Sequence, residues 1–229
     1  MLLLAIDSSA TASVTLARLE PCAGASATIL AHRETADTRS HAEVMAQFVR
    51  EVLNEAGITG SELDAVLTGT GPGPFTGLRV GIVTARTLGF TWNVPVYGLM
   101  SLYSIAENTW EHAAAQSAHT FMVAADARRR EIYSAIFALG DGSYELVEGP
   151  SVGSAAEAPA LPAYGFGAGL YSEQLQTVEG YERLHANSRD LVHAAARLGI
   201  KNLSTDTAAL YLRESDAKVP AARKKATRA

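Results

Sequence analysis

A run of glycine and proline in the middle of the chain limits the folds that the sequence can adopt. Four glycines and two prolines fall within nine residues, Gly69-Thr70-Gly71-Pro72-Gly73-Pro74-Phe75-Thr76-Gly77. Glycine reaches positive φ without steric cost, whereas proline fixes φ at about −65° and has no N–H. The run joins an apolar segment at 65–68 to a helical pattern that reaches Trp92, so it predicts a tight strand-to-helix junction. Proteins of the α/β class place ligand-binding backbone at such junctions.

The loop differs from the two common phosphate-binding loops. The P-loop pattern places Lys directly after its second glycine, but the first basic residue after Gly77 is Arg79. The dinucleotide pattern G-x-G-x-x-G is broken because Gly71 is followed by Pro-Gly-Pro. The pattern therefore favours a rigid corner over a phosphate-binding loop. This structural loop comprises Gly69, Gly71, Pro72, Gly73, Pro74, Phe75, Thr76, Gly77 and Arg79.

The composition is typical of a soluble protein. The chain has 229 residues, 48% hydrophobic and 19% charged, which suffices for one large domain or two lobes. Cys22 is the one cysteine, which excludes an internal disulfide and favours a reducing compartment. The apolar start, Met1 to Ile6, has no basic flank and meets Asp7 at once, which favours a buried strand over a signal peptide or membrane span. We therefore expect a cytoplasmic protein.

The charge is unevenly distributed. The formal net charge is −5, yet the last ten residues carry four basic residues and no acid, which leaves about −9 for the rest. An acidic body repels the phosphates of a nucleic acid, so the globular part is expected to bind RNA poorly unaided. We expect residues 220–229 to form a basic, solvated and disordered tail.

The hydrophobic pattern restarts about halfway along the chain, about 118 residues after its first strand. Strand-like runs open each half, at 2–7, 13–19 and 28–33 in the first and at 120–125, 131–139 and 144–147 in the second. An aspartate follows the core of the first run in each set, at Asp7 and Asp126. The repetition predicts two lobes of shared design.

Helices are predicted between and after these strands. Ser40 and Glu43 form a capping box, and apolar residues continue at helical spacing until Gly57. A later helix is expected at 189–198, with Ser188 as its cap.

The helix predicted at 76–92 carries a stripe of small residues. Gly81, Ala85 and Gly89 follow one another at intervals of four. Small residues let a second element approach closely. The stripe therefore packs either on the chain's own sheet or against a helix of a partner.

Residues with catalytic chemistry are sparse. None of the six histidines lies three or four residues from another, so no helical face offers a paired metal site, and the G-x-S-x-G pattern of a serine nucleophile is absent. Asp7 and Asp126 end buried strands, where a carboxylate either ligates Mg²⁺ beside a phosphate or forms a turn. Three arginines at 128–130, beside Glu131, either bind an anion or form a solvated hairpin tip with local ion pairs.

Four segments resemble, in the same order, the bacterial TsaB (YeaZ) family. They are Leu4-Ala5-Ile6-Asp7-Ser8-Ser9, Arg39-Ser40-His41-Ala42-Glu43, the loop from Gly71 to Gly81, and Asp126-Ala127-Arg128-Arg129-Arg130-Glu131-Ile132-Tyr133. The resemblance continues to Tyr211-Leu212-Arg213. It implies the α/β actin-like ATPase (ASKHA) fold, with two lobes that each have a mixed sheet, a three-stranded antiparallel opening and flanking helices. The implied division is an N-terminal lobe at 1–100 with the partner-binding helices, a C-terminal lobe at 101–219 and the tail at 220–229.

In function, the resemblance implies a non-catalytic dimerisation subunit. Its partner is the larger paralogue TsaD, a transferase that makes threonylcarbamoyladenosine beside the anticodon of tRNAs reading codons that start with A. The family also implies a small ATPase, TsaE, a homodimer when the partner is missing, and contact with tRNA through the complex alone. It implies no catalytic residue, metal or cofactor in this chain, with ATP or ADP at the interface shared with TsaD.

The family pairs its subunits through helices of the N-terminal lobes, which implies an interface on the helices at 40–57 and 76–92. The implied interface residues are His41, Met45, Phe48, Val52, Leu78, Gly81, Ile82, Ala85, Arg86 and Gly89. A charge at Ala85 is then expected to abolish pairing and to leave the monomer folded.

Active actin-like ATPases usually carry D-x-G-[TS] in the first hairpin, where this chain has Asp7-Ser8-Ser9-Ala10. Losing the glycine adds bulk where the backbone approaches the nucleotide. The resemblance thus implies a vestigial nucleotide site at Asp7, Ser8, Ser9 and Asp126. The main alternative is an autonomous actin-like phosphotransferase that uses Asp7 and Asp126 around Mg²⁺-ATP. A peptidase is a third reading.

Overall fold

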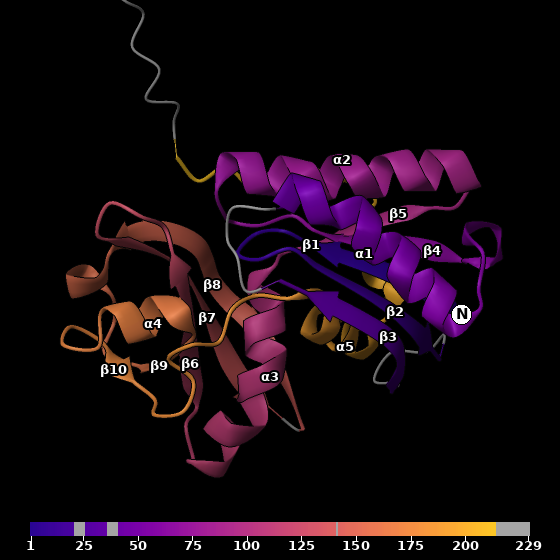
Figure 1. Ribbon diagram of the computed structural model, residues 1–229. Coiled ribbons are helices and arrows are strands. Elements are labelled where there is room, and N and C mark those ends of the chain that lie inside the picture. The colour runs from indigo at the N-terminus through magenta and orange to yellow at the C-terminus, as the bar shows by residue number, and fades with distance from the viewer. Residues whose placement is uncertain (21–25, 36–40, 141, 214–229) are drawn as a thin grey trace, which may run out of the picture.

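The structure, a computed structural model, describes residues 1–20, 26–35, 41–140 and 142–213. They form two lobes that lie side by side (Figure 1). Each lobe is built on a five-stranded mixed sheet.

The first sheet has the strand order β3-β2-β1-β4-β5. Its strands are β1 (Leu2–Asp7), β2 (Ser13–Leu19), β3 (Ala27–Glu34), β4 (Ala65–Gly69) and β5 (Val96–Leu99). Strands β1 to β3 are antiparallel, whereas β4 and β5 run parallel to β1. Leu3 and Ala5 belong to the core on one face, and Leu4 and Ile6 to the core on the other. Helices cover both faces, which is why β1 is a continuous apolar run.

The second sheet repeats this topology. Its strands are β6 (Thr120–Asp126), β7 (Glu131–Gly140), β8 (Ser143–Ser154), β9 (Pro162–Tyr164) and β10 (Gln176–Thr177). The order β10-β9-β6-β7-β8 matches the first sheet when β6 is equated with β1 and β9 with β4. Strands β6 to β8 are antiparallel, and β9 runs parallel to β6. The repeated design expected from the sequence is therefore confirmed.

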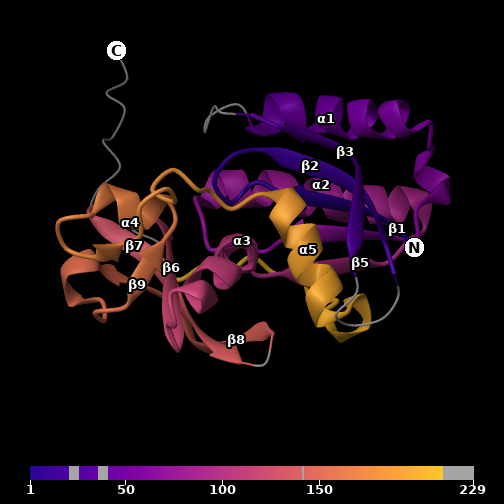
Figure 2. The ribbon, with the colours of Figure 1, turned by 90° about the horizontal axis from the view of Figure 1, so that it is seen from below.

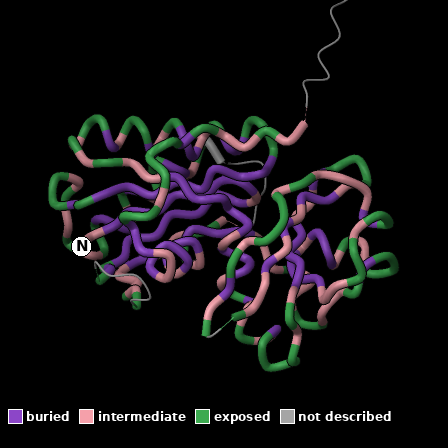
Figure 3. Tube along the Cα trace, turned by 180° about the vertical axis from the view of Figure 1, so that it is seen from behind, coloured by how far each residue is buried: buried purple, intermediate pink, exposed green. Residues whose placement is uncertain are grey.

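Helices lie on both faces of each sheet. On the first, α1 (His41–Ala56) and α2 (Phe75–Trp92) cover one face, and α5 (Ser188–Leu198) covers the other (Figure 2). On the second, α3 (Leu102–Ala115) and the short α4 (Phe166–Leu170) pack on separate core clusters. Single 3₁₀ turns occur at Gly60–Glu62, Ala155–Glu157 and Ile200–Asn202. Buried residues concentrate in the strands, and exposed residues lie along the outer helices (Figure 3).

Helix caps match the sequence in part. The Asn187 side chain, and not Ser188, caps α5, because its Oδ1 accepts a hydrogen bond from the Asp190 N–H at 2.9 Å. The Ser188 hydroxyl lies instead 2.7 Å from the Thr15 hydroxyl of β2. The expected cap Ser40, with Arg39 and Cys22, falls outside the described residues.

Helix α5 follows the second sheet in sequence but packs on the first. Leu191, Val192 and Ala195 belong to the core that contains Leu3 and Leu67. The expected assignment of all of 101–219 to the second lobe is thus wrong for α5, since the face of β1 and β2 opposite α1 needs an apolar cover. A boundary at residue 100 stays a prediction, and the tail at 220–229 falls outside the described residues.

An ion pair joins α5 to α3 at the junction of the lobes. The Arg197 guanidinium donates two hydrogen bonds to the Glu107 carboxylate, both at 2.9 Å, and stacks on Trp110 with 4.4 Å to the ring centroid. The Tyr144 hydroxyl of β8 donates to the same carboxylate at 2.8 Å. Three elements from both lobes therefore meet at Glu107.

Candidate functional site

The Gly-Pro loop packs directly on the first hairpin, around a buried carboxylate. Asp7 is fully buried and accepts hydrogen bonds from the Ser9 N–H, the Ser9 hydroxyl and the Ser101 hydroxyl at 2.8, 2.6 and 2.6 Å. The Ser101 hydroxyl accepts in turn from the Gly71 N–H at 3.0 Å. A side chain at Gly69 would collide with the carboxylate. Burial raises the pKa of Asp7, and the hydrogen bonds from Ser101 and Ser9 offset part of that rise.

The close packing accounts for the glycines of the loop. Gly71 has a φ of +92°, in the region that favours glycine. A Cβ on Gly73 would meet the backbone of Ser9 at 2.5 Å. These contacts support the interpretation of the loop as a rigid corner that holds the strand, the helix and the hairpin together.

Ser8 fixes α2 to the hairpin. Its hydroxyl donates to the Gly77 carbonyl at 2.7 Å and accepts from the Gly81 N–H at 2.9 Å, so it bridges two groups that are one helical turn apart. A Cβ on Gly81 would collide with this hydroxyl, and one on Gly89 would collide with Val96 of β5. The small-residue stripe therefore faces the chain's own sheet.

The structure does not bring the two aspartates of the suggested nucleotide site together at one surface. A hollow of about 40 Å³ between the lobes is lined by Ser9, Ala10 and Asp126, with His185 beside them. Asp7 lies behind Ser9 with its carboxylate committed to internal hydrogen bonds. A shared Mg²⁺ site on both carboxylates, as the phosphotransferase alternative requires, does not fit this geometry.

Most of the apolar residues implied at the partner interface lie inside the monomer. Five of them are at most 5% exposed, namely Met45, Val52, Leu78, Ile82 and Ala85. Gly81 and Gly89 are also buried, Phe48 is half-buried, and the side chain of His41 lies outside what the structure describes. The expectation that a charge at Ala85 leaves the monomer folded is wrong, because Ala85 is fully buried against the first sheet.

Other residues of α2 form an exposed stripe. Val83 is 59% exposed and Phe90 is 89% exposed, and the exposed Arg86 lies between them. Their spacing of three and four residues puts them on one face. We call Val83, Arg86 and Phe90 the outer stripe of α2. Of these, only Arg86 was implied by the sequence, since periodicity does not tell the inner face of a helix from the outer.

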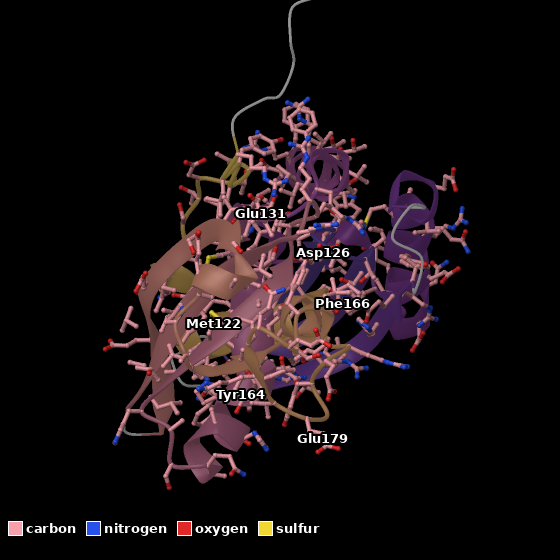
Figure 4. All side chains as sticks on the ribbon, turned by 90° about the vertical axis from the view of Figure 1, so that its left-hand side faces the viewer. Met122, Asp126, Glu131, Tyr164, Phe166 and Glu179 are labelled. Atoms are coloured by element: carbon pink, nitrogen blue, oxygen red, sulfur yellow. The ribbon has the colours of Figure 1, made fainter. Side chains whose placement is uncertain are left out.

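A cleft of about 560 Å³ opens beside the start of α2. Its walls come from the Gly-Pro loop, from the turn between β6 and β7, and from the final segment 211–213. The lining residues are Gly73, Pro74, Phe75, Asp126, Ala127, Arg128, Arg129, Tyr133, Tyr211, Leu212 and Arg213. Figure 4 shows Asp126 and Glu131 on the side of the second lobe that faces α2.

The arginine turn at this cleft has an unusual backbone. Arg128, Arg129 and Arg130 have φ values of 61°, 55° and 65°, which L-residues other than glycine, asparagine and aspartate seldom adopt. The Arg128 guanidinium pairs with Asp126 at 3.1 Å, and Arg213 pairs with Glu131. The turn thus combines the two sequence interpretations, because it is a hairpin tip with ion pairs and also presents arginines to a cleft.

An aromatic cluster forms the opposite rim. The Phe75 and Tyr211 rings lie 5.1 Å apart, and the Arg79 guanidinium stacks 3.7 Å from the Phe75 centroid. Arg79 Nε also donates to the Tyr211 hydroxyl at 3.0 Å. Sequence reasoning missed this cluster because 132 residues separate Arg79 from Tyr211. The aromatic residue of Tyr211-Leu212-Arg213, after the predicted helix at 189–198, was the signal available in the sequence.

One polar arrangement bears on the peptidase reading. The Thr15 hydroxyl lies 2.8 Å from His32 Nδ1, and His32 Nε2 lies 3.6 Å from the Glu34 carboxylate, the order of a nucleophile, base and acid. Thr15 is fully buried, however, and its hydroxyl also contacts Ser188. A substrate has no access to the hydroxyl in this structure.

Two kinds of feature are absent from the described residues. No group of three or more His, Cys, Asp or Glu side chains there is arranged to hold a metal ion. No helix there combines the length and the apolar character that crossing a membrane requires.

The chain is similar to known proteins over most of its length. Residues 28–210 match the family model for TsaD, tRNA N6-adenosine threonylcarbamoyltransferase. The structure of YeaZ from Pseudomonas aeruginosa superposes with a TM-score of 0.72 and 26% identity, and the match covers 92% of this chain and 99% of that one. The chain belongs to the TsaB (YeaZ) family. Its fold is accordingly the actin-like ASKHA fold, as the resemblance implied.

Relatives of this TsaB-family chain are found across bacteria. The Mycobacterium tuberculosis protein Rv3421c is 35% identical over 190 residues, which cover 83% of each chain. The Escherichia coli tRNA threonylcarbamoyladenosine biosynthesis protein TsaB is 32% identical over 106 residues, or 46% of this chain and 44% of that protein. A second Pseudomonas aeruginosa structure, with a TM-score of 0.75, is described as similar to the peptidase YeaZ.

Proposed function

We propose that this chain is an accessory subunit in the synthesis of threonylcarbamoyladenosine in tRNA. In this proposal it pairs with a TsaD-type transferase and carries no catalytic residue of its own. Relatives named as TsaB biosynthesis proteins support the pathway. ATP or ADP binds at the surface shared with the transferase, a TsaE-like ATPase joins the pair, and the chain forms a homodimer when alone.

The observation that carries the pairing is the outer stripe of α2. A side chain as apolar as Phe90 is seldom left 89% exposed beside a second exposed apolar residue on the same helix face. Arg86 between them donates to the Thr207 hydroxyl at 2.6 Å, which links its guanidinium to the segment that follows α5. Aromatic residues and arginine are enriched in protein interfaces. The stripe therefore has the composition of a docking face on a rigid element.

The buried hairpin supports the accessory role. The Asp7 carboxylate has three hydrogen-bond donors within the chain and no exposed surface. An acidic group that ligates a metal or positions a nucleotide needs free lone pairs at the surface of the site. Asp7 acts instead as the centre of the corner that holds the loop and the hairpin.

The test combines binding and activity. The purified chain is titrated by calorimetry into the TsaD-type transferase of the same organism, and tRNA modification is assayed with each protein alone and with both. We expect association, and modification only in the mixture. No association, together with nucleotide turnover by this chain alone, would favour the phosphotransferase alternative.

A matched pair of variants locates the interface. Val83→Asp puts a charge on the outer stripe, and Val147→Asp puts the same charge on β8 of the other lobe, at a valine of similar exposure, 52% against 59%. We expect Val83→Asp to weaken pairing by about tenfold or more, because an unpaired charge is desolvated there. Val147→Asp is expected to pair normally. Equal affinities for the two variants would place the interface elsewhere.

A further inference from the structure

The cleft between the arginine turn and the final segment lies outside the outer stripe, and its chemistry points to a separate ligand. Three arginines and one aspartate are its charged lining residues, in a chain whose net charge is −5. Asp126 pairs with Arg128, and Glu131 pairs with Arg213, so three arginines against two carboxylates leave a local charge of +1, opposite in sign to that of the whole protein. A cleft with a surplus of one sign of charge attracts ligands of the other sign.

The shape of the turn presents these charges. Consecutive positive φ values at residues 128–130 bend the backbone so that Arg128 and Arg129 line the cleft and Arg130 is exposed at the tip. An L-residue in this conformation costs about 1 to 2 kcal/mol. Strained backbone of this kind clusters at ligand-binding sites.

The opposite rim offers flat apolar surfaces. Phe75 and Tyr211 are 54% and 45% exposed and lie side by side. Arginine next to exposed aromatic rings is the composition that binds single-stranded nucleic acid, since guanidinium groups contact phosphates and rings stack on unpaired bases. The volume, about 560 Å³, is in the range of sites that hold one small molecule or one nucleotide unit.

The sequence that follows the cleft residue Arg213 is also positively charged. Arg213 lines the cleft, and the sixteen residues that follow it in the sequence contain five lysines and arginines against two acids. In the sequence, this basic segment directly follows a residue that lines the cleft.

We propose that this cleft binds single-stranded RNA, with a phosphate at Arg128 and Arg129 and an unpaired base on Tyr211. The choice of RNA rests on the proposed function, whose substrate is a tRNA with an unpaired anticodon loop. Free ATP shares the chemistry of a phosphate and a base, and the experiment separates the two. Because the body of the chain is acidic, the isolated protein binds weakly and the affinity falls steeply with salt.

The experiment measures the fluorescence anisotropy of a labelled anticodon stem–loop RNA, with a blunt RNA duplex of equal length as the comparison probe. The triple-glycine variant, Arg128→Gly, Arg129→Gly and Arg130→Gly, removes three charges and suits the positive φ values. The control removes three exposed charges elsewhere, as Arg18→Ala, Arg50→Ala and Arg189→Ala. Tyr211→Ala tests stacking at an exposed residue, where loss of the fold is not expected.

The stem–loop is expected to bind more tightly than the duplex. The triple-glycine variant should lose about tenfold or more in affinity, and the slope of log K against log salt should become shallower by about 0.7, the contribution of one phosphate contact to a single strand. Tyr211→Ala should weaken binding by about 5- to 150-fold with an unchanged slope. The control triple should keep the slope of the wild type.

Three outcomes would overturn the inference. The first is an equal loss of affinity in the triple-glycine and control variants, which would reduce the effect to net charge. The second is duplex binding as tight as stem–loop binding, with Tyr211→Ala unchanged. The third is complete displacement of the RNA by excess ATP that binds stoichiometrically. Pairing with the transferase is measured in a separate experiment. A lack of pairing would therefore contradict the proposed function without contradicting RNA binding by this chain.

Discussion

The Ser101 hydroxyl donates a 2.6 Å hydrogen bond to the buried Asp7 carboxylate, although 94 residues separate the two in sequence. Ser101 precedes α3 of the second lobe, and Asp7 ends β1 of the first. The same hydroxyl accepts from the Gly71 N–H, so one serine connects the hairpin, the Gly-Pro loop and the start of the second lobe. The carboxylate is the acceptor on which this connection depends.

Asp7→Asn is expected to change how stability varies with pH. Because burial raises the pKa of Asp7 above its ordinary 3.8, the folded chain holds the proton more tightly than the unfolded chain does. The stability from this proton is fully present below about pH 3.8 and is lost as the pH rises through the pKa of the folded protein. Urea unfolding should therefore show the wild type losing stability relative to Asp7→Asn as the pH rises above about 3.8. A constant difference over that range would contradict the raised pKa.

Gly81→Ala is expected to destabilise the chain although alanine is the better helix former. Helix propensity alone favours alanine by about 1 kcal/mol, but the added Cβ collides with the Ser8 hydroxyl. We expect a net loss of about 1 to 3 kcal/mol in the free energy of unfolding. Gly153→Ala on β8, where the new Cβ meets no atom within 4 Å, is the matched control and should be nearly neutral.

The collision partner is tested by a double variant. Ser8→Ala removes the hydroxyl, so Gly81→Ala should cost less in the Ser8→Ala background than in the wild type. Additive costs would show that the Ser8 hydroxyl is not what excludes a side chain at position 81.

Arg197→Ala is expected to loosen the contact between the lobes. It leaves the largely buried Glu107 carboxylate without its bidentate partner and removes the stack on Trp110. We expect a loss of about 2 to 3 kcal/mol in chemical unfolding. Arg33→Ala, which breaks ion pairs with the more exposed Glu51 and Glu55, should cost much less. Equal losses of stability in the two variants would show that the buried Arg197–Glu107 pair contributes no more than the exposed pairs of Arg33.

The fold could be predicted largely from sequence because local signals agree with the tertiary structure. The strands at 2–7 and 13–19 have the predicted bounds, and the predicted helix at 76–92 is one residue longer. The duplicated opening predicted two sheets, which the common strand order bears out. Short elements such as α4 and β10 were missed, since five and two residues carry no periodicity.

The candidate site was less predictable because it depends on which face of a helix is covered. Ala85 and Val83 are two residues apart and both apolar, yet the smaller alanine is fully buried and the more hydrophobic valine is 59% exposed. The difference arises from the position of β1 and β4 beneath α2, which no local pattern contains. The cleft likewise requires Arg128, Phe75 and Tyr211 from three distant segments. Such contacts follow only from the assembled fold.

Helix α5 has a consequence for the order in which the molecule can form during synthesis. The core that contains Leu3 also contains Leu191 and Val192, so β1 completes this core only after α5, far later in the sequence, has been synthesised. Until residue 198 has been made, one apolar face of the first sheet has no cover from its own chain. During translation, the N-terminal half is therefore expected to leave an apolar face of its sheet exposed to solvent until α5 is made. A chaperone that binds apolar strands would find its binding site on this face for all of that time.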